Sequence, residues 1–232
     1  VVLPQRPKDQ WPLVVGYSDI TALHALLSLH GVPSLHANMC KDLSLLPDED
    51  MALVAEREFL TALQLPSSLS LTSHLLPLTY HPSPHHANIP YTIHHASSSS
   101  LNRVGEARGK LIGGNLSVLY GLQGTPYSLS RVIEQCAEPP ILFIEDICER
   151  HYHIDRMLHN LRMSGVFDRI GGLVLGEFTD CPDDASMGCT LRESIRQIVE
   201  PYAFPVLFDY PSGHIDSNYP LLLSAEYHLS VP

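Results

Sequence analysis

Short apolar runs alternate with helix-like segments along most of the chain, and this alternation constrains the fold more than any other feature. Runs typical of buried strands occupy residues 12–16 (PLVVG), 141–146 (ILFIED) and 171–178 (GGLVLGEF). They alternate with segments in which apolar residues recur at helical spacing, the clearest being 17–31 and 154–167. Strands that alternate with helices in this way predict an α/β fold.

The two clearest helices show apolar stripes. The later one carries Ile154, Met157, Leu158 and Leu161, and the earlier one carries Ile20, Leu23, Leu26, Leu27 and Leu29 before a stop at Gly31. A third helical pattern covers 48–64. Thr190 and Glu193 form a capping box that predicts a further helix start.

Three other segments complete the expected pattern. In 109–122 (GKLIGGNLSVLYGL), a turn at Gly113-Gly114 is expected to lead into a helix. Residues 204–214 are expected to form a strand that ends in a turn, and residues 219–231 to form one or two closing strands.

Residues 65–105 differ in character, with five prolines, the run Ser97–Ser100 and many histidines. This composition predicts a connector or flap, in which 72–81 and 89–95 could be strands. The histidines have no fixed metal-ligand spacing, and we interpret them as polar side chains that face water rather than as a zinc site. They are His81, His85, His86, His94 and His95.

The charge and the cysteines exclude several classes of protein. The chain has 14 Lys and Arg against 25 Asp and Glu and no basic stretch, which argues against nucleic-acid binding. No apolar run approaches the roughly 20 residues that span a membrane, and the first residues do not resemble a signal peptide. Five cysteines without a CxxC pair indicate free thiols in a reducing compartment, so we expect the cytoplasm. Cys181 and Cys189 could pair, and Cys40 has no pattern that would support it as a nucleophile.

Three polar residues stand where predicted strands end, namely Ser18, Glu145 and His214. The carboxyl ends of strands are where α/β folds assemble their sites. Ser18, at a strand-to-helix turn, could be a nucleophile or simply a helix cap. His214 could be a general base or an ordinary loop histidine, and Glu145 could orient that base or, with Asp146, begin a helix.

Several blocks in the same order resemble the LD-carboxypeptidase family of serine peptidases, which also includes microcin-immunity hydrolases. The first is VVGYSDITALHALL at 14–27, followed by GKLIGGNLSVLYGLQGTPY at 109–127. The others are ILFIEDICERHYHIDRMLHNL at 141–161, LVLGEF at 173–178 and SGHIDSNYPL at 212–221. The resemblance runs from about residue 10 to about residue 225.

The resemblance implies that Ser18 is the nucleophile, Glu145 the acid and His214 the base of a catalytic triad. The backbone N–H of Asp19 would then donate to the oxyanion. Glu177, which also ends a strand, is a rival acid that we place beside the triad. No metal or cofactor is implied.

Recognition of the substrate carboxylate needs a cation or several N–H groups. Asn115, in the Gly-Gly-Asn block, is expected near the substrate. Arg156 and Arg103 are the candidate cations.

The resemblance also implies two domains. A Rossmann-like parallel-sheet domain, expected to be incomplete here, would include residues 1–72, with a linker or flap at 73–105. An α/β domain with a β-rich core, carrying the acid and the base, would follow at 106–232. The Gly-rich block that family members have before the nucleophile is absent, so we expect the natural chain to begin before Val1.

The implied activity is removal of the terminal D-Ala from peptidoglycan L,D-tetrapeptides in cell-wall recycling, by a homodimer. One alternative is a hydrolase of peptidyl- or aminoacyl-nucleotide amides, which would need an aromatic platform for the base; Trp11, the single Trp, precedes the nucleophile strand. The other is an inactive binding module of the same fold.

Overall fold

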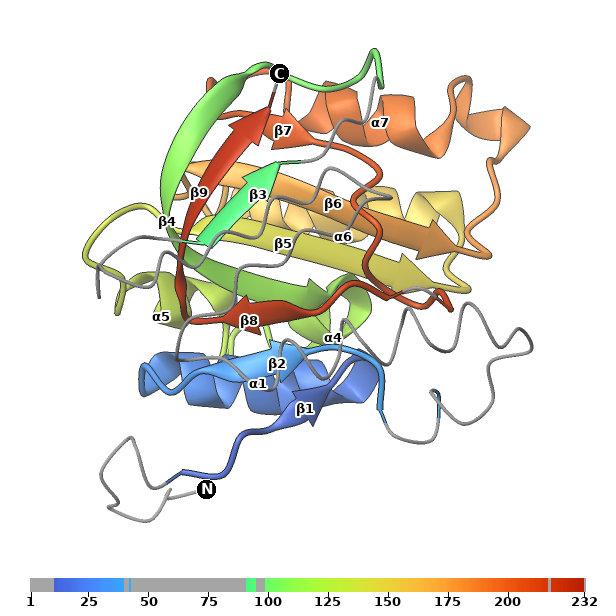
Figure 1. The fold of residues 1–232 in the computed structure, drawn as a ribbon. Coiled ribbons are helices and arrows are strands. Elements are labelled where there is room, and N and C mark those ends of the chain that lie inside the picture. The colour runs from blue at the N-terminus through green and yellow to red at the C-terminus, as the bar shows by residue number, and fades with distance from the viewer. Residues whose placement is uncertain (1–10, 40–41, 43–90, 95–98, 217, 232) are drawn as a thin grey trace, which may run out of the picture.

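The computed structural model describes residues 11–39, 42, 91–94, 99–216 and 218–231. The predicted helix at 48–64, the possible strand at 72–81, Cys40 and the histidines His81, His85, His86 and His95 lie outside these residues. Strands and helices are layered as the sequence predicts for an α/β protein (Figure 1).

Two sheets form the frame of the molecule. The smaller has the order β1-β2-β8, with β1 (Val15–Gly16) parallel and β8 (Leu221–Leu223) antiparallel to β2 (Ser34–His36). The larger has the order β3-β9-β4-β5-β6-β7. Its strands are β3 (Tyr91–His94), β4 (Gly105–Asn115), β5 (Ile141–Ile147), β6 (Gly172–Thr179), β7 (Val206–Leu207) and β9 (Glu226–Val231).

The larger sheet curls until its ends nearly meet. Strands β4, β5, β6 and β7 are parallel, whereas β9 pairs antiparallel with β4 and parallel with β3. Arg103, just before β4, exchanges two backbone hydrogen bonds of 2.9 and 3.1 Å with Val206 of β7. Strand β4 therefore arches over to the far edge of its own sheet, as Figure 1 shows.

Alternate side chains of β5 enter two different cores. Ile141 and Phe143 point into the curled sheet, where they join an apolar cluster with residues of β6, β8 and β9. Leu142 and Ile144 point the other way, into a larger cluster beneath the helices. Both cores exclude solvent at β5, because these four side chains are at most 1% exposed.

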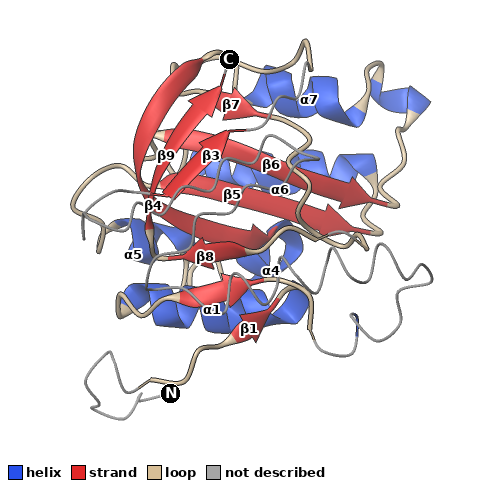
Figure 2. Cartoon of the chain, viewed as in Figure 1, coloured by secondary structure: helices blue, strands red, loops and turns tan. Residues whose placement is uncertain are grey.

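The helices lie outside the strands, as Figure 2 shows. They are α1 (Thr21–Leu29), α4 (Leu116–Gly121), α5 (Leu129–Ile133), α6 (His151–Met163) and α7 (Leu191–Ile198), with short 3₁₀ turns η2 (Ser18–Ile20) and η3 (Ala185–Met187). The predicted stripe on α6 is confirmed, because Ile154, Met157, Leu158 and Leu161 are all buried. The Thr190–Glu193 capping box is present at the start of α7.

The predicted stripe on α1 is only partly correct. Leu23 is 45% exposed, and the buried face instead includes Thr21, His24 and Ser28. The reason is close packing: a Cβ built on Gly114 of β4 would come within 2.6 Å of the Thr21 hydroxyl oxygen. Of the predicted stripe Leu27 is buried, and the rest of the buried face of α1 consists of small and polar side chains.

The expected turn at Gly113-Gly114 is wrong. Both glycines lie within β4 and pair with β5, and α4 begins only after its cap residue Asn115. A Cβ on Gly113 would lie 1.8 Å from the carbonyl oxygen of Phe143, so only glycine fits there. The glycines therefore serve close strand pairing and do not reverse the chain.

Other expectations have mixed outcomes. Residues 12–16 and 204–214 contain only the two-residue strands β1 and β7, whereas 219–231 forms two strands and 89–95 contains β3. Glu145 and Asp146 lie inside β5 and do not begin a helix. Among the described cysteines, Cys136, Cys148, Cys181 and Cys189 are free thiols, so Cys181 and Cys189 are not paired.

Strand β8 ties the two sheets together. It pairs with β2 through the register His36↔Leu221, yet Leu221 and Leu223 pack in the core of the larger sheet. The intervening Leu222 packs against Leu35 and Ala37 on the smaller sheet. The strand that holds β2 is thus anchored in the part of the molecule that carries Glu145 and His214.

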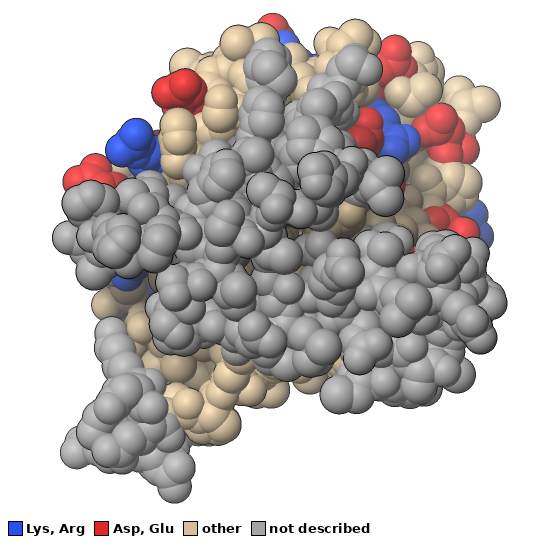
Figure 3. All heavy atoms as spheres, viewed as in Figure 1, with Lys and Arg blue, Asp and Glu red and all other residues tan. Residues whose placement is uncertain are grey.

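Two surface features complete the fold. On the face drawn in Figure 3, side chains of both charge signs lie around the rim. Within the described ranges, every helix is too short or too polar to pass through a lipid bilayer.

Candidate active site

Ser18 is the first residue of η2, two residues after the end of β1, and has a left-handed backbone conformation, with φ of 57°. This region is uncommon for residues other than glycine, and strain of this kind concentrates at functional turns. Ser18 is not a helix cap, because the cap residues are Tyr17 for η2 and Ile20 for α1. The turn has the strand-to-helix geometry that presents a nucleophile.

A buried histidine supports this turn from α1. His24 Nε2 lies 3.0 Å from the carbonyl oxygen of Gly16, and its Nδ1 lies 2.8 Å from the Ser34 hydroxyl. Burial lowers the pKa of His24 to about 4, so the ring is neutral near pH 7. Because a carbonyl can only accept, Nε2 carries the proton and Nδ1 accepts from Ser34.

Glu145 lies two residues after Phe143 and points to the same side of β5, and its carboxylate is fully buried. Its Oε2 lies 2.7 Å from Nδ1 of His214, a side chain that is 11% exposed. Burial alone would raise the pKa of Glu145, but the hydrogen bond with His214 and the nearby imidazole of His36 hold it below its ordinary value. Nδ1–H of His214 therefore donates to an ionised carboxylate, which leaves Nε2 to accept a proton.

The turn that carries His214 approaches Glu145 closely. Gly213 has φ of 137°, and a Cβ there would lie 3.1 Å from Glu145 Oε2. The Gly213 N–H donates to Asn218 Oδ1 over 2.9 Å, and the Ser212 hydroxyl lies 2.9 Å from the carbonyl oxygen of Tyr219. Glycine at 213 thus permits the approach, and these hydrogen bonds hold it.

Tyr17 connects the Ser18 turn to His214. Its ring packs edge-on against His214, with centroids 4.8 Å apart. Burial, together with the hydrogen-bonded carboxylate of Asp42, raises the pKa of Tyr17 to about 12, so the phenol stays neutral. Tyr17, the residue before Ser18, therefore contacts His214, the histidine that would accept the Ser18 proton.

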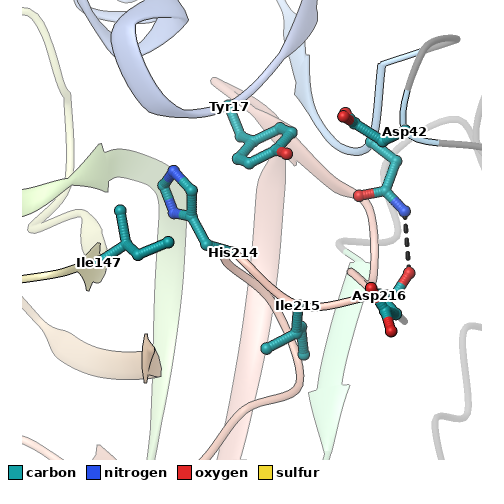
Figure 4. Close-up of a pocket in the computed structure, with 7 residues that line it drawn as sticks. Tyr17, Asp42, Ile147, His214, Ile215 and Asp216 are labelled. Atoms are coloured by element: carbon teal, nitrogen blue, oxygen red, sulfur yellow. Dashed lines mark hydrogen bonds between the residues drawn. The ribbon is translucent and has the colours of Figure 1, made fainter. Parts of the chain in front are cut away.

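A cavity of about 250 Å³ opens beside these residues (Figure 4). His214, Tyr17 and Ile147 line one part of it, and Ile215, Asp216, Asn38 and Asp42 line the rest. Asn38 Nδ2 donates to the Asp216 carbonyl over 3.1 Å, drawn as the dashed line in Figure 4. The cavity offers a substrate both apolar contacts and carboxylates.

Asn115 lies beside Glu145 in the sheet but its side chain is engaged within the protein. It pairs in register with Glu145, accepts from Val118 N–H at the start of α4 and donates to Asp146 over 3.0 Å. Asp146 also accepts two hydrogen bonds from Ser117. This arrangement joins β4, β5 and α4 below the site.

The candidate cations lie elsewhere. Arg156 is exposed on α6 and stacks over the Tyr152 ring. Arg103 donates to the carbonyl oxygens of Val199, Tyr202 and Phe204 after α7. Neither arginine lines the cavity beside His214.

Two further candidates lie near strand ends. Glu177 on β6 is 3.9 Å from Arg192, and burial followed by the charge of Asp209 raises its pKa. The structure thus brings His214 to Glu145 and leaves Glu177 with different partners. Asp19 is in the first turn of η2, where backbone N–H groups lack helical acceptors.

No pattern in the sequence singles out His24, His36 or Tyr17. All three contact the site, yet each is one of many similar residues, since the chain has 14 His and 10 Tyr. For Tyr17 and His24, the available signal was their position within the block at 14–27 around Ser18; His36 lies outside that block. Among the described residues, no cluster of His, Cys, Asp and Glu could hold a metal ion.

Comparisons with known proteins agree with this architecture. Residues 108–229, more than half of the chain, match the family model described as the LD-carboxypeptidase C-terminal domain. The murein tetrapeptide carboxypeptidase of Pseudomonas aeruginosa is 32% identical over 88% of this chain and 58% of its own length. The probable murein peptide carboxypeptidase of Bacillus subtilis is 28% identical, over 97% and 60%. The chain thus spans about three fifths of the length of these relatives.

Solved structures share the fold. The muramoyltetrapeptide carboxypeptidase from Oxalobacter formigenes superposes with a TM-score of 0.68 at 24% identity, covering 95% of this chain and 65% of that one. The microcin C7 self-immunity protein, in its wild-type form without ligand, gives 0.68 at 20% identity, covering 96% and 67%. With the family match over residues 108–229, the chain belongs to the LD-carboxypeptidase family.

Proposed function

We propose that this chain carries the catalytic residues of a serine carboxypeptidase that removes the terminal D-Ala from peptidoglycan L,D-tetrapeptides. The observation that carries the proposal is the 2.7 Å contact between Glu145 and His214. The ring of Tyr17, the residue before Ser18, packs against this histidine. The names of the murein carboxypeptidase relatives support the substrate class. Removal of D-Ala would belong to cell-wall recycling.

In the first step, Ser18 Oγ attacks the carbonyl carbon of the third stem-peptide residue. His214 Nε2 takes the serine proton and passes it to the amine nitrogen as the bond to D-Ala breaks. Glu145 fixes the tautomer of His214 and stabilises its positive charge. D-Ala leaves, and the rest of the peptide remains as an ester on Ser18.

In the second step, water attacks this ester. His214 takes a proton from the water and returns it to Ser18 Oγ, which releases the shortened peptide with a new carboxylate. The Asp19 N–H would donate to the oxyanion in both steps, and loss of one such donor costs roughly 3 kcal/mol in the barrier.

The test is release of D-Ala from a stem tetrapeptide by the purified 232-residue chain. Ser18→Ala should lower kcat by a factor of roughly 10⁴ or more, because the nucleophile is lost. Ser186→Ala, in the other 3₁₀ turn, is the matched control and should leave the rate unchanged. Equal rates for the wild type and Ser18→Ala would reject the proposal.

The rival substrate is a peptidyl- or aminoacyl-nucleotide amide. The microcin C7 self-immunity protein of Escherichia coli is 30% identical over 112 residues, covering 47% of this chain and 30% of its own length. The Tyr17 ring, which lines the cavity, could also contact the nucleobase of such a substrate. A competition between tetrapeptide and aminoacyl sulfamoyl adenosine separates the two, and we expect the tetrapeptide to have the higher kcat/KM.

We further propose that the protein is a homodimer in the cytoplasm. Each chain would have two domains, residues 1–72 and residues 106–232. The free thiols at Cys136, Cys148, Cys181 and Cys189 support a reducing compartment. Light scattering at several concentrations tests the dimer, and a constant monomer mass would reject it.

A further inference from the structure

A second buried histidine faces the acid on the side away from His214. His36, the last residue of β2, has its Nε2 3.8 Å from Glu145 Oε1, and both side chains are 0% exposed. Neither of these two atoms has a hydrogen-bond partner among the described residues. The 3.8 Å contact therefore joins two buried polar atoms that make no hydrogen bond to another described residue.

The other nitrogen of His36 meets the turn of the base. Its Nδ1 lies 3.4 Å from Ser212 Oγ, which in turn lies 3.0 Å from Asn218 Oδ1 and 2.9 Å from the Tyr219 carbonyl. Asn218 Oδ1 also accepts from Gly213 N–H, so this oxygen is an acceptor. Ser212 therefore donates its one proton to an acceptor other than His36.

This arrangement decides where His36 carries a proton. If Nε2 were unprotonated, its lone pair would face the Glu145 carboxylate inside the protein, and two buried acceptors would repel each other. A proton on Nε2 replaces that repulsion with attraction. The contact with the carboxylate therefore favours the tautomer in which Nε2–H faces Glu145 Oε1.

Aromatic rings lie around the ring of His36. It packs edge-on against Phe143, with centroids 5.0 Å apart, and Tyr17 and His24 lie at 6.3 and 6.2 Å. Its backbone pairs with Gly16, two residues before Ser18. The residue thus touches Glu145, the turn that carries the base and the strand that leads to the nucleophile.

We propose that His36 is a positioning residue that fixes Glu145 Oε1, so that Oε2 stays aligned with Nδ1 of His214. Glu145 then bridges two imidazoles, one on β2 and one on the turn after β7. The proposal rests on the proposed function only for its effect on catalysis. The geometry of the Glu145–His214 pair can be measured without any substrate.

The test compares His36→Gln, which can place an amide N–H near the Nε2 position, with His36→Leu, which cannot donate. His30→Leu, at an exposed histidine after α1, is the matched control. Thermal unfolding first establishes that each variant folds. If His36→Leu does not fold, His36→Asn replaces it, because its amide is too short to reach Glu145.

Two readouts do not depend on the substrate. The proton NMR signal of His214 Nδ1–H should shift in His36→Leu and return toward the wild-type position in His36→Gln. The rate at which a fluorophosphonate labels Ser18 should follow the same order. Identical signals and labelling rates in all three proteins would overturn the proposal.

The third readout is turnover of the tetrapeptide. His36→Leu should lower kcat by roughly 10-fold to 100-fold with little change in KM, since small displacements of catalytic groups have effects of this size. His36→Gln should recover most of the loss. Equal kcat for Gln and Leu would reject positioning through Nε2–H. If the wild type releases no D-Ala, the proposed function fails, whereas the NMR and labelling comparison still decides the role of His36.

Discussion

Two carboxylates lie near the ends of neighbouring strands, Glu145 on β5 and Glu177 on β6, and their surroundings differ. Glu145 is fully buried and faces an imidazole on each side. The Glu177 side chain is 30% exposed and lies near Arg192, itself a surface residue. A carboxylate that orients a catalytic histidine must contact that histidine, and Glu145 meets this requirement.

Glu145→Gln should therefore lower kcat for D-Ala release by roughly 10³-fold to 10⁴-fold, because the amide can stabilise the wrong tautomer of His214. Glu177→Gln is the matched control and should stay within a few-fold of the wild type. Steady-state kinetics on the tetrapeptide decides between them. A larger loss for Glu177→Gln would make Glu177 the acid.

His24 should make stability depend on pH in a defined window. Its pKa is about 4 in the folded protein, against an ordinary 6.5, so between these values the unfolded chain binds a proton that the folded chain does not. Stability is therefore complete above pH 6.5 and falls as the pH drops toward 4, by roughly 3 kcal/mol at most.

His24→Gln should remove this part of the slope while its amide still donates to the Gly16 carbonyl. His30→Gln, at an exposed position, should keep the slope. Urea unfolding between pH 4 and pH 7 measures both variants. An unchanged slope in His24→Gln would show that other groups cause the pH dependence.

At this scale the sequence predicted the residue types better than their surroundings. Ser18, Glu145 and His214 were selected because strands end beside them, and strand ends can be predicted from apolar runs. His36 was not selected, because its importance depends on a contact with Glu145 across more than 100 residues of chain. A single sequence carries no sign of which buried histidine faces a carboxylate.

At the scale of elements, the junction of β4, β5 and α4 depends on one amide. Asn115 caps α4 through Val118 N–H and donates to Asp146, which is 1% exposed. Burial raises the pKa of Asp146, although hydrogen bonds from Ser117, Ile147 and Asn115 oppose this rise. The amide therefore supports a helix start and a buried carboxylate together.

Asn115→Ala should lower the free energy of unfolding by about 1–3 kcal/mol, from loss of the cap and of a hydrogen bond to a buried group. The KM for tetrapeptide should change little, because the side chain is engaged within the protein. Asn160→Ala on α6, where Oδ1 has no partner among the described residues, is the matched control and should cost less. A raised KM with unchanged stability would instead place Asn115 against the substrate.

Element predictions failed where packing overrode local preference. The Gly113-Gly114 pair is typical of a turn, but in the structure it allows β4 to approach β5. The apolar residues of α1 predicted a leucine face, but the sheet leaves room only for small side chains beside Gly114. Both errors share one cause, because a partner strand distant in sequence determines which residue fits.

At the scale of the molecule, β8 holds the two sheets together. Leu223 is 0% exposed in the core of the larger sheet, whereas Leu222 is partly buried on the smaller one. Leu223→Ala should lower the free energy of unfolding by about 2–5 kcal/mol, as for other buried leucines. Leu222→Ala should cost less, and urea unfolding of the two variants compares them. Equal losses would mean that the smaller sheet is packed as tightly as the larger.

The α/β class was predictable from the alternation of strands and helices, since that pattern is local. The curl of the larger sheet was not, because it depends on Arg103 reaching Val206 across about 100 residues. The pairing of β8 with β2 was equally hidden, since three leucines could join any apolar core.

The pairing of β2 with β8 can form only late in the synthesis of the chain. His36 and Ser212, which meet in the finished protein, are 176 residues apart. A ribosome that adds about 5–20 residues per second needs roughly 10–35 s to make the chain between them. For that interval the segment with Ser18 and His36 has left the ribosome before its partners exist, and one edge of β2 is open to wrong pairing. Chaperone protection of the nascent chain should therefore matter most before Leu221–Leu223 emerge.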